Sequence, residues 1–304
     1  MKIFLSKINE SWIVDRVRQE WYDSNKNLST QWVSKADIIW IISPWLWKKI
    51  PKKQLRKKTV LCSYYHFDFD NFDYEEFKEL DQYVDQYHVI SEKTKKDLKT
   101  LTSKKITSIP FWVNQEIFYE IKDKSKLKKE FGFNENDYLI GSFQRDTEGS
   151  DLISPKLIKG PDIFLDLIKE IIKEKANLKV ILSGKRRNYL INNFEKAGIP
   201  YEYFEMVNLE ELNKLYNILD LYLVTSRIEG GPQAILECGI TKTPILSTDV
   251  GVASEILHPD SLYNENNFSK AKTNSEFAYK NSLEFIIPKG IQKFNLMLEE
   301  LYES

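Results

Sequence analysis

The chain is poor in cysteine, histidine and early glycine. Its 304 residues include two cysteines and three histidines, and the first glycine is Gly132. Cys62 and Cys238 lie far apart, with none of the spacings of metal-ligand motifs, which excludes a cysteine-based zinc site or a disulfide scaffold and fits a reducing cytoplasm. The 44 basic and 45 acidic residues nearly cancel. We therefore expect no nucleic-acid partner.

Long hydrophobic runs are also missing. The longest, 38–47, is interrupted by Ser43 and Pro44 and is shorter than the roughly 20 residues that span a bilayer. Residues 1–7 hold one short apolar run, where a signal peptide needs about 7–15 apolar residues, so this segment is predicted as a first strand. We expect a cytoplasmic protein with no integral membrane segment.

The 42% of hydrophobic residues suffices for a core, and the length predicts two domains at roughly 150 residues each. All eleven glycines fall in the second part of the chain, which indicates two halves with different backbone demands. We place the N-terminal domain at 1–120 and the C-terminal domain at 121–285. Residues 286–304 are expected to form a helix that can pack back at the domain junction.

Short apolar runs alternate with polar helical windows along both halves. This alternation predicts parallel sheets with helices on their faces, hence an α/β fold. Strands are predicted at 2–5, 37–42, 59–64, 87–90, 105–109, 138–143, 178–183, 201–204, 221–225 and 244–247. Helices are predicted at 12–22, 74–83, 92–101, 122–130 and 291–302.

Two such halves would be Rossmann-like domains that face one another across a cleft, with ligands outside the carboxyl ends of the strands. No Gly-x-Gly-x-x-Gly follows a predicted strand, and no Gly-Lys-Ser/Thr of the Walker type occurs. Dinucleotide dehydrogenases and P-loop NTPases are therefore disfavoured.

The segment 221–257 is predicted as strand, tight loop, helix, strand, loop and short helix. In its first loop, Glu229 precedes Gly230 and Gly231 just before the helix, and Glu237 follows within that helix. Two glycines let a ligand approach the backbone, and free amides with the positive end of a helix dipole favour phosphate. An ordinary Gly-Gly-Pro turn flanked by solvated carboxylates is the alternative.

This segment, with its two glutamates eight positions apart, closely resembles the signature of the retaining glycosyltransferases of family 4, which have the two-domain GT-B fold. The resemblance implies that Glu229 contacts the donor sugar, that the amides of Gly230 and Gly231 hold the diphosphate, and that Glu237 binds the ribose hydroxyls. The donor would be a nucleotide-diphosphate sugar, and no metal or other cofactor is implied.

A second match to the same family comes from the strand that ends near Arg145 and from Lys159-Gly160, which opens a helix. In the family these two cations grip the donor diphosphate. A lysine at the start of a helix also opposes the helix dipole, so an anion there would be stabilising. His66 ends a predicted strand of the first half, as does a family histidine that reaches the reacting sugar; a simple packing role is the alternative.

The first half departs from the family pattern. Residues 7–12 replace the usual glycine-rich loop, and 111–114 replace the usual linker sequence. These departures lie on the acceptor side, so the donor chemistry is better supported than any particular acceptor. Asp68 and Asp70 form an Asp-x-Asp, the metal motif of the GT-A enzymes, but this motif is frequent by chance and a turn is favoured.

One basic run interleaves cations with apolar residues between 45 and 58, and seven of the eleven positions 48–58 are basic. Such a pattern suits the boundary between lipid headgroups and acyl chains, which predicts peripheral contact with the inner face of the membrane. A solvated loop whose apolar residues face the core is the alternative. The residues concerned are Trp45, Trp47, Lys48, Lys49, Lys52, Lys53, Arg56, Lys57 and Lys58.

The favoured hypothesis is a retaining, hexosyltransferase-type enzyme that acts on a glycan or lipid-linked acceptor in surface polysaccharide synthesis. A sugar phosphorylase of the same fold would use inorganic phosphate and would leave Glu237 without a ribose. A non-catalytic nucleotide-sugar or glycan-binding domain is a further alternative, given the departures in the first half.

Overall fold

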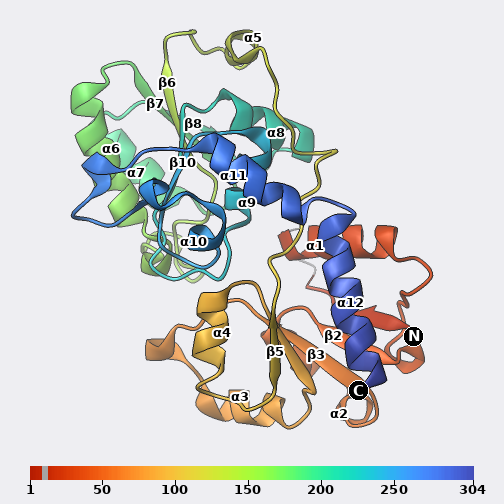
Figure 1. Ribbon diagram of the computed structural model, residues 1–304. Helices are drawn as coiled ribbons and strands as arrows, with labels where there is room; N and C mark the ends of the chain where they lie inside the picture. The colour runs from red at the N-terminus through yellow and green to blue at the C-terminus, as the bar shows by residue number, and fades with distance from the viewer. Residues whose placement is uncertain (9–12) are drawn as a thin grey trace. The chain divides into compact units, whose positions relative to one another are not determined.

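The computed structural model describes residues 1–8 and 13–304 (Figure 1). The start expected for the first helix at Trp12, and most of the loop 7–12, lie outside the described residues. The chain divides into a first unit of residues 1–112 with 285–304 and a second unit of residues 113–284.

This division falls earlier than the boundary expected near residue 120. Trp112 packs on Trp21 of the first unit, with ring centroids 6.3 Å apart. The Tyr119 and Ile121 amides instead donate to side chains of the second unit, at 3.1 and 2.7 Å. Residues 113–120 therefore belong with the second unit, and the C-terminal segment belongs with the first.

The first unit contains one five-stranded sheet, in which all neighbouring strands are parallel and lie in the order β1-β2-β3-β4-β5. Its strands are β1 (Ile3–Leu5), β2 (Ile38–Ile41), β3 (Thr59–Tyr64), β4 (Gln86–Val89) and β5 (Lys105–Ser108). Its helices are α1 (Ile13–Ser24), α2 (Lys52–Leu55), α3 (Tyr74–Asp81), α4 (Glu92–Leu98) and α12 (Lys289–Glu303), with 3-10 helices at Val33–Lys35, Pro44–Lys49 and Phe69–Asn71.

Aromatic side chains fill both faces of this sheet. On one face, Phe294 of α12 stacks on Trp40 of β2 at 5.3 Å and lies 4.9 Å from His88 of β4. On the other face, Phe77 of α3 stacks on Tyr87 of β4 at 6.0 Å. The alternation of side chains along β4 thus assigns α12 and α3 to opposite faces. The last helix therefore completes the core of the unit that begins the chain.

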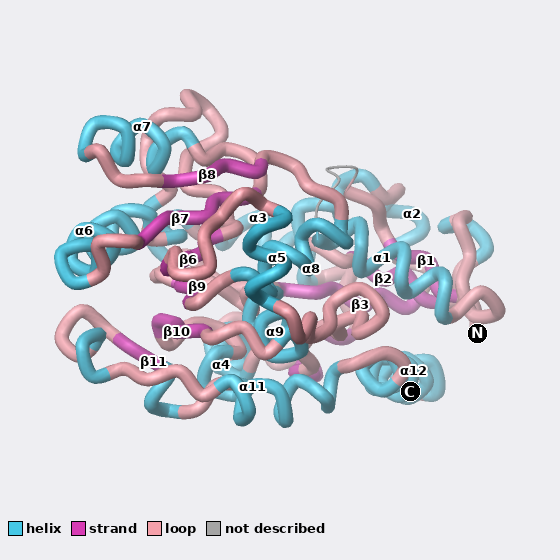
Figure 2. The backbone as a smooth tube through the Cα atoms, turned by 90° about the horizontal axis from the view of Figure 1, so that it is seen from above, coloured by secondary structure: helices cyan, strands magenta, loops and turns pink. Residues whose placement is uncertain are grey.

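The second unit contains a six-stranded sheet, also parallel throughout, in the order β11-β10-β9-β6-β7-β8 (Figure 2). Its strands are β6 (Tyr138–Ser142), β7 (Leu178–Ser183), β8 (Tyr201–Phe204), β9 (Leu221–Val224), β10 (Ile245–Thr248) and β11 (Leu262–Tyr263). Its helices are α5 (Lys124–Glu130), α6 (Pro161–Glu174), α7 (Asn188–Ala197), α8 (Leu209–Ile218), α9 (Gln233–Thr241), α10 (Ala253–Ile256) and α11 (Ser275–Ser282). Short 3-10 helices lie at Leu157–Lys159, Pro259–Ser261 and Phe268–Lys270, and Leu283–Phe285 spans the division between the units.

The order of this second sheet reverses once. From β6 the chain runs outward through β7 and β8, and it then returns to β9 on the other side of β6 before continuing to β10 and β11. Ligands of open α/β sheets bind outside the carboxyl ends of the strands at such a reversal. The loops that follow β6 and β9 therefore form the expected binding position. In the first sheet the order does not reverse.

Candidate functional site

The reversal between β6 and β9 brings together most of the residues predicted from the sequence. Arg145 follows the end of β6, and Lys159 lies near the end of the same long connection, separated from α6 only by Gly160. Glu229, Gly230 and Gly231 follow β9 and precede α9. The topology of the second unit thus places both predicted cations and the predicted acidic loop at one edge of one sheet.

Lys159 is held against the end of β9 by its own backbone. Its carbonyl accepts hydrogen bonds from Gln144 Nε2 at 2.9 Å and from Thr225 Oγ1 at 3.3 Å. Gly160 follows with a φ of +63°, and a Cβ on it would lie 1.9 Å from the Thr225 carbonyl oxygen. Only glycine permits this close approach to the Thr225 carbonyl, which explains why a glycine follows Lys159.

The Lys159 ammonium is paired with the Glu229 carboxylate. Their side chains are 18% and 14% exposed, so both remain accessible from solvent. An anionic ligand at this edge would compete with the carboxylate for the ammonium, whereas a hydroxyl-rich ligand would compete with the ammonium for the carboxylate. The pair therefore joins an anion-binding group to a hydroxyl-binding group.

The Gly230–Gly231 peptide packs on Gly251, in the loop after β10. Gly251 has a φ of +50°, and a Cβ on it would lie 2.1 Å from the Gly230 carbonyl oxygen and 2.8 Å from the Gly231 nitrogen. Three glycines therefore meet at this point, and the loop after β10 fixes the position of the loop after β9. The sequence alone did not predict this contact between Gly251 and the Gly230–Gly231 peptide.

Glu237 lies in α9, where it is 4% exposed. Its Oε2 accepts a hydrogen bond of 2.6 Å from the Tyr216 hydroxyl. Burial, together with the nearby Glu237 charge, holds the pKa of Tyr216 well above its ordinary value, so the phenol keeps its proton and donates. The sequence missed Tyr216, which comes from α8 and orients the carboxylate.

A buried ion pair supports the loop that carries Arg145. Arg187, which is fully buried, lies 3.2 Å from the Asp146 carboxylate and also donates to the Gln144 carbonyl. Burial raises the pKa of Asp146 to about 6, although the Arg187 charge opposes this. Arg145 is therefore flanked on both sides by residues bound to Arg187. The sequence shows this arginine only as the second of an Arg-Arg pair, so it was not predicted.

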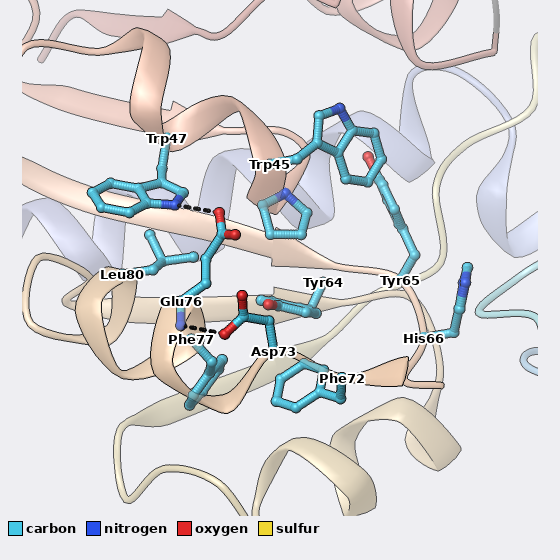
Figure 3. Close-up of a pocket in the computed structure, with 11 residues that line it drawn as sticks. Trp45, Trp47, Tyr64, Tyr65, His66, Phe72, Asp73, Glu76, Phe77 and Leu80 are labelled. Atoms are coloured by element: carbon cyan, nitrogen blue, oxygen red, sulfur yellow. Dashed lines mark hydrogen bonds between the residues drawn. The ribbon is translucent and has the colours of Figure 1, made fainter. Parts of the chain in front are cut away.

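His66, the remaining predicted residue, belongs to the first unit. It is half-buried and lies at the edge of a pocket of about 250 Å³ at the ends of β2 and β3 (Figure 3). Most of the pocket wall is aromatic, and two carboxylates contribute to it. The sequence did not predict this pocket, because its walls come from three separate segments. Its lining is Pro44, Trp45, Trp47, Tyr64, Tyr65, His66, Phe72, Asp73, Glu76, Phe77 and Leu80.

The Asp-x-Asp of the first unit forms a local turn. Asp68 accepts a hydrogen bond of 2.9 Å from the Asn71 side chain, and Asp70 lies in the short 3-10 helix that follows. Within residues 1–8 and 13–304, no group of three or more His, Cys, Asp or Glu side chains is arranged to hold a metal ion.

The basic run 45–58 packs against the rest of the first unit through most of its apolar residues. Its apolar members Leu46, Trp47, Ile50 and Leu55 are buried, whereas Trp45 is 53% exposed. Two of its lysines are engaged with α3: Lys48 lies 3.0 Å from Glu76, and Lys52 pairs with Glu79 at 2.5 Å. Most of the apolar residues that suggested lipid contact thus face the core. None of the described helices is both long and apolar enough to cross a bilayer.

The fold of this chain is similar to that of known structures. Anabaena Alr3699/HepE in complex with UDP and glucose matches 99% of this chain and 100% of its own, with a TM-score of 0.75 and 14% identity. Sucrose-phosphate synthase from Thermosynechococcus elongatus matches 98% of this chain and 82% of its own, with a TM-score of 0.70 and 13% identity. These neighbours are glycosyltransferases of the GT-B class, and the predicted fold is confirmed.

The family is shown by the sequence itself. The family model for glycosyl transferases group 1 matches residues 123–284, more than half of the chain, and the chain belongs to this family. The lipopolysaccharide core biosynthesis mannosyltransferase LpsB of Rhizobium meliloti is 25% identical over 142 residues, which are 44% of this chain and 38% of that protein. The match thus spans well under half of that curated relative.

Proposed function

We propose that the protein is a retaining glycosyltransferase that moves a hexose from a nucleotide-diphosphate sugar to a glycan or lipid-linked acceptor. The observation that carries the proposal is the Lys159–Glu229 pair at the strand-order reversal of a group 1 domain. A cation and a carboxylate side by side match a ligand whose diphosphate adjoins a sugar. The name of the relative LpsB favours surface polysaccharide synthesis as the setting.

The chemistry proposed for this site is electrostatic. As the glycosidic bond of the donor breaks, negative charge grows on the leaving diphosphate. Lys159, Arg145 and the amides of Gly230 and Gly231 would stabilise that charge, and fixed donors of this kind are each worth about 10²–10³ in rate. Because these groups supply the positive charge, we expect turnover without a divalent metal.

The remaining residues would orient the reactants. Glu229 would hold the sugar hydroxyls, and Glu237, aligned by Tyr216, would accept from the ribose. His66 would contact the sugar from the first unit. By resemblance to the retaining enzymes, the departing phosphate would take the proton from the acceptor hydroxyl, so the new bond forms on the face that the old one left.

We also propose that the basic run brings the enzyme to an anionic membrane surface at the cytoplasmic side. Lys49, Lys53, Arg56 and Lys57 are exposed, and so is the ring of Trp45. Each cation near an anionic surface contributes about 1 kcal/mol. This contact would be electrostatic, because the other apolar residues of the run are buried.

A thermal-shift panel of UDP, GDP, ADP, CMP, dTDP and inorganic phosphate, with magnesium and with EDTA, tests the donor site. UDP is the first candidate, since it accompanies the neighbour HepE. A ligand that binds only the folded state raises stability by RT ln(1 + [L]/Kd). We expect one diphosphate to raise Tm equally with magnesium and with EDTA. A shift with inorganic phosphate alone would favour a phosphorylase, and no shift with any nucleotide would contradict the proposal.

The stereochemistry has its own test. With the nucleotide known, its sugar conjugates are supplied together with acceptor glycosides, and the anomeric proton coupling of the product is read by NMR. A retaining mechanism predicts that the product has the same anomeric configuration as the donor. Transfer with the opposite configuration would leave the glycosyltransferase assignment standing and overturn the retaining mechanism. Nucleotide binding without any transfer would support the non-catalytic alternative.

A further inference from the structure

The pocket of the first unit has walls suited to a flat, partly apolar ring. The exposed ring of Trp45 lies 6.4 Å from that of Tyr65, tilted by 58°, and the Tyr64 ring stacks on Phe67 at 4.8 Å. Figure 3 shows Trp45 and Tyr65 on one side of the pocket and Phe72 on the other. Aromatic rings with an accessible face bind apolar ligand faces through large contact area at little entropic cost.

Polar groups converge on the same pocket. Glu76 Oε1 accepts from Trp47 Nε1 at 3.1 Å and lies 3.0 Å from Lys48 Nζ, while Asp73 Oδ1 accepts from the Glu76 amide at 2.8 Å. Each carboxylate is fixed through one oxygen, and a carboxylate has roughly four lone-pair sites in all. The pocket therefore offers ordered acceptors beside its aromatic walls.

Tyr64 adds a donor between these acceptors. Burial raises the pKa of Tyr64, and the nearby Glu76 and Asp73 charges raise it further, so its hydroxyl stays protonated. Within the described part of the chain, this hydroxyl forms no hydrogen bond. In Figure 3 it points toward the Asp73 carboxylate. A ligand with several hydroxyl groups can accept from Tyr64 and donate to the carboxylates at once.

The size and charge of the pocket restrict the ligand further. Its volume of about 250 Å³ lies below the roughly 300–1,000 Å³ typical of sites for drug-sized molecules, which limits it to one ring or a little more. Lys48 offsets the charge of Glu76, whereas no ion pair to Asp73 is formed by the described residues. An anionic ligand would thus face an uncompensated carboxylate.

We propose that this pocket binds one uncharged sugar ring of the acceptor, stacked on Trp45 and hydrogen-bonded to Asp73 and Tyr64, and that it rejects uronic acids. This inference rests on the proposed function for its biological role. The binding chemistry itself rests on the pocket alone. Asp73 is the residue that decides between neutral and acidic sugars.

Saturation-transfer difference NMR on the full chain tests the proposal, with methyl α-D-glucopyranoside and methyl α-D-glucuronide as probes. We expect transfer to the glucoside, reduced at least fivefold in Trp45→Ala. The matched control is Trp32→Ala, because Trp32 is 65% exposed in the same unit and does not line the pocket. This control should match the wild type.

A second variant, Asp73→Asn, tests the selectivity against acidic sugars. Asp73 caps α3, and asparagine caps helices about as well as aspartate, so Asp73→Asn should fold normally. In the wild type, we expect the glucuronide signal to be at least fivefold weaker than the glucoside signal. In Asp73→Asn, the glucuronide signal should approach the glucoside signal. Equal signals from both probes in the wild type would overturn the charge selectivity. A glucoside signal that is absent, or that Trp45→Ala leaves unchanged, would overturn the pocket assignment.

The same samples separate this inference from the proposed function. A nucleotide-induced thermal shift reports on the second unit and should be unchanged in Trp45→Ala and Asp73→Asn. Trp45-dependent sugar binding without any nucleotide shift would contradict the donor proposal and leave the sugar pocket standing. A nucleotide shift without sugar binding would overturn the pocket alone.

Discussion

Gly251 and Gly230 are in contact through their backbones, so that a Cβ at position 251 would lie 2.1 Å from the Gly230 carbonyl oxygen. The loop after β10 thereby sets the position of the amides that we assign to the donor diphosphate. A side chain at position 251 would displace those amides as well as strain its own backbone.

Gly251→Ala should therefore abolish the nucleotide-induced thermal shift. It should also lower the free energy of unfolding by more than the roughly 1–2 kcal/mol that the left-handed region costs alanine, because the added Cβ clashes with the Gly230 backbone as well. Gly198→Ala is the matched control: Gly198 has a φ of +64° in the same unit but no atom within 4 Å of its Cβ position. We expect that control to lose only the roughly 1–2 kcal/mol of the left-handed region and to keep the nucleotide shift. Loss of the shift in both variants would refute the contact argument.

Lys159→Ala should reduce turnover by about 10²–10³ while the protein folds normally, because a fixed cation for the leaving diphosphate is lost. Steady-state kinetics with the nucleotide sugar measures this, and Glu229→Ala should also lose most turnover. Lys156→Ala is the control, since Lys156 lies in the same connection and is likewise ion-paired, with Glu148. Near-wild-type transfer by both Lys159→Ala and Glu229→Ala would remove the basis of the assignment.

The buried Arg187–Asp146 pair should reveal itself in a double-mutant cycle. Arg187→Met leaves a carboxylate buried without its cation, which typically costs about 3–5 kcal/mol of stability. Adding Asp146→Leu removes that charge, so the double variant should recover most of the loss. Urea unfolding measures Arg187→Met, Asp146→Leu and the double variant against the wild type. A double variant no more stable than Arg187→Met would show that the pair contributes through packing rather than charge.

His88 should make the protein sensitive to mild acid. Its Nε2 lies 2.8 Å from the Ile109 carbonyl, so Nε2 carries the proton, and Nδ1 accepts from Ser63 in the neutral ring. Burial lowers the pKa of His88 from 6.5 to about 4. The stability due to the neutral ring is thus complete above pH 6.5 and is lost as the pH falls toward 4.

That loss amounts to about 3 kcal/mol, at 1.36 kcal/mol for each unit of pKa. His88→Gln removes the titrating group, so the difference in unfolding free energy between wild type and variant should shrink from pH 6.5 to pH 4. Urea titrations at half-unit intervals measure it. A difference that stays constant over this range would mean that His88 has the same pKa in the folded and the unfolded protein.

The membrane proposal predicts weaker sedimentation with anionic vesicles for a Lys49→Glu, Lys53→Glu, Lys57→Glu variant. These side chains are exposed and outside the described ion pairs, so the fold should be retained. The loss should be large at low salt and small at high salt, because exposed charges are screened. Binding equal to wild type at low ionic strength would eliminate membrane contact through this run.

Much of the fold could be predicted from periodicity. The predicted strands 59–64, 178–183 and 201–204 have the bounds of β3, β7 and β8, since each is an apolar run between clear turn signals. The two-residue strand β11 was missed, because such a short strand has no period to detect. The early end of the first domain was also missed, since it depends on contacts of Trp112 with distant residues.

The candidate site was predictable where it follows a local motif. Lys159, Glu229 and the two glycines after it form short sequence patterns, and the structure joins the lysine to the glutamate. Tyr216 and Arg187 support the site from other elements, and nothing local distinguishes a buried supporting tyrosine or arginine from an exposed one. The pocket of the first unit was not predicted either, because its walls come from three separate segments of the chain.

The position of α12 has a consequence for the order in which the protein matures during translation. The second unit is continuous and has all its residues once position 284 has been synthesised. The synthesis of the first unit begins earlier, but this unit lacks Phe294 until after the second unit has been synthesised, and Trp40 and His88 have no partner from α12 before then. All residues of the second unit are thus present before the first unit, although it begins the chain, can complete its aromatic core.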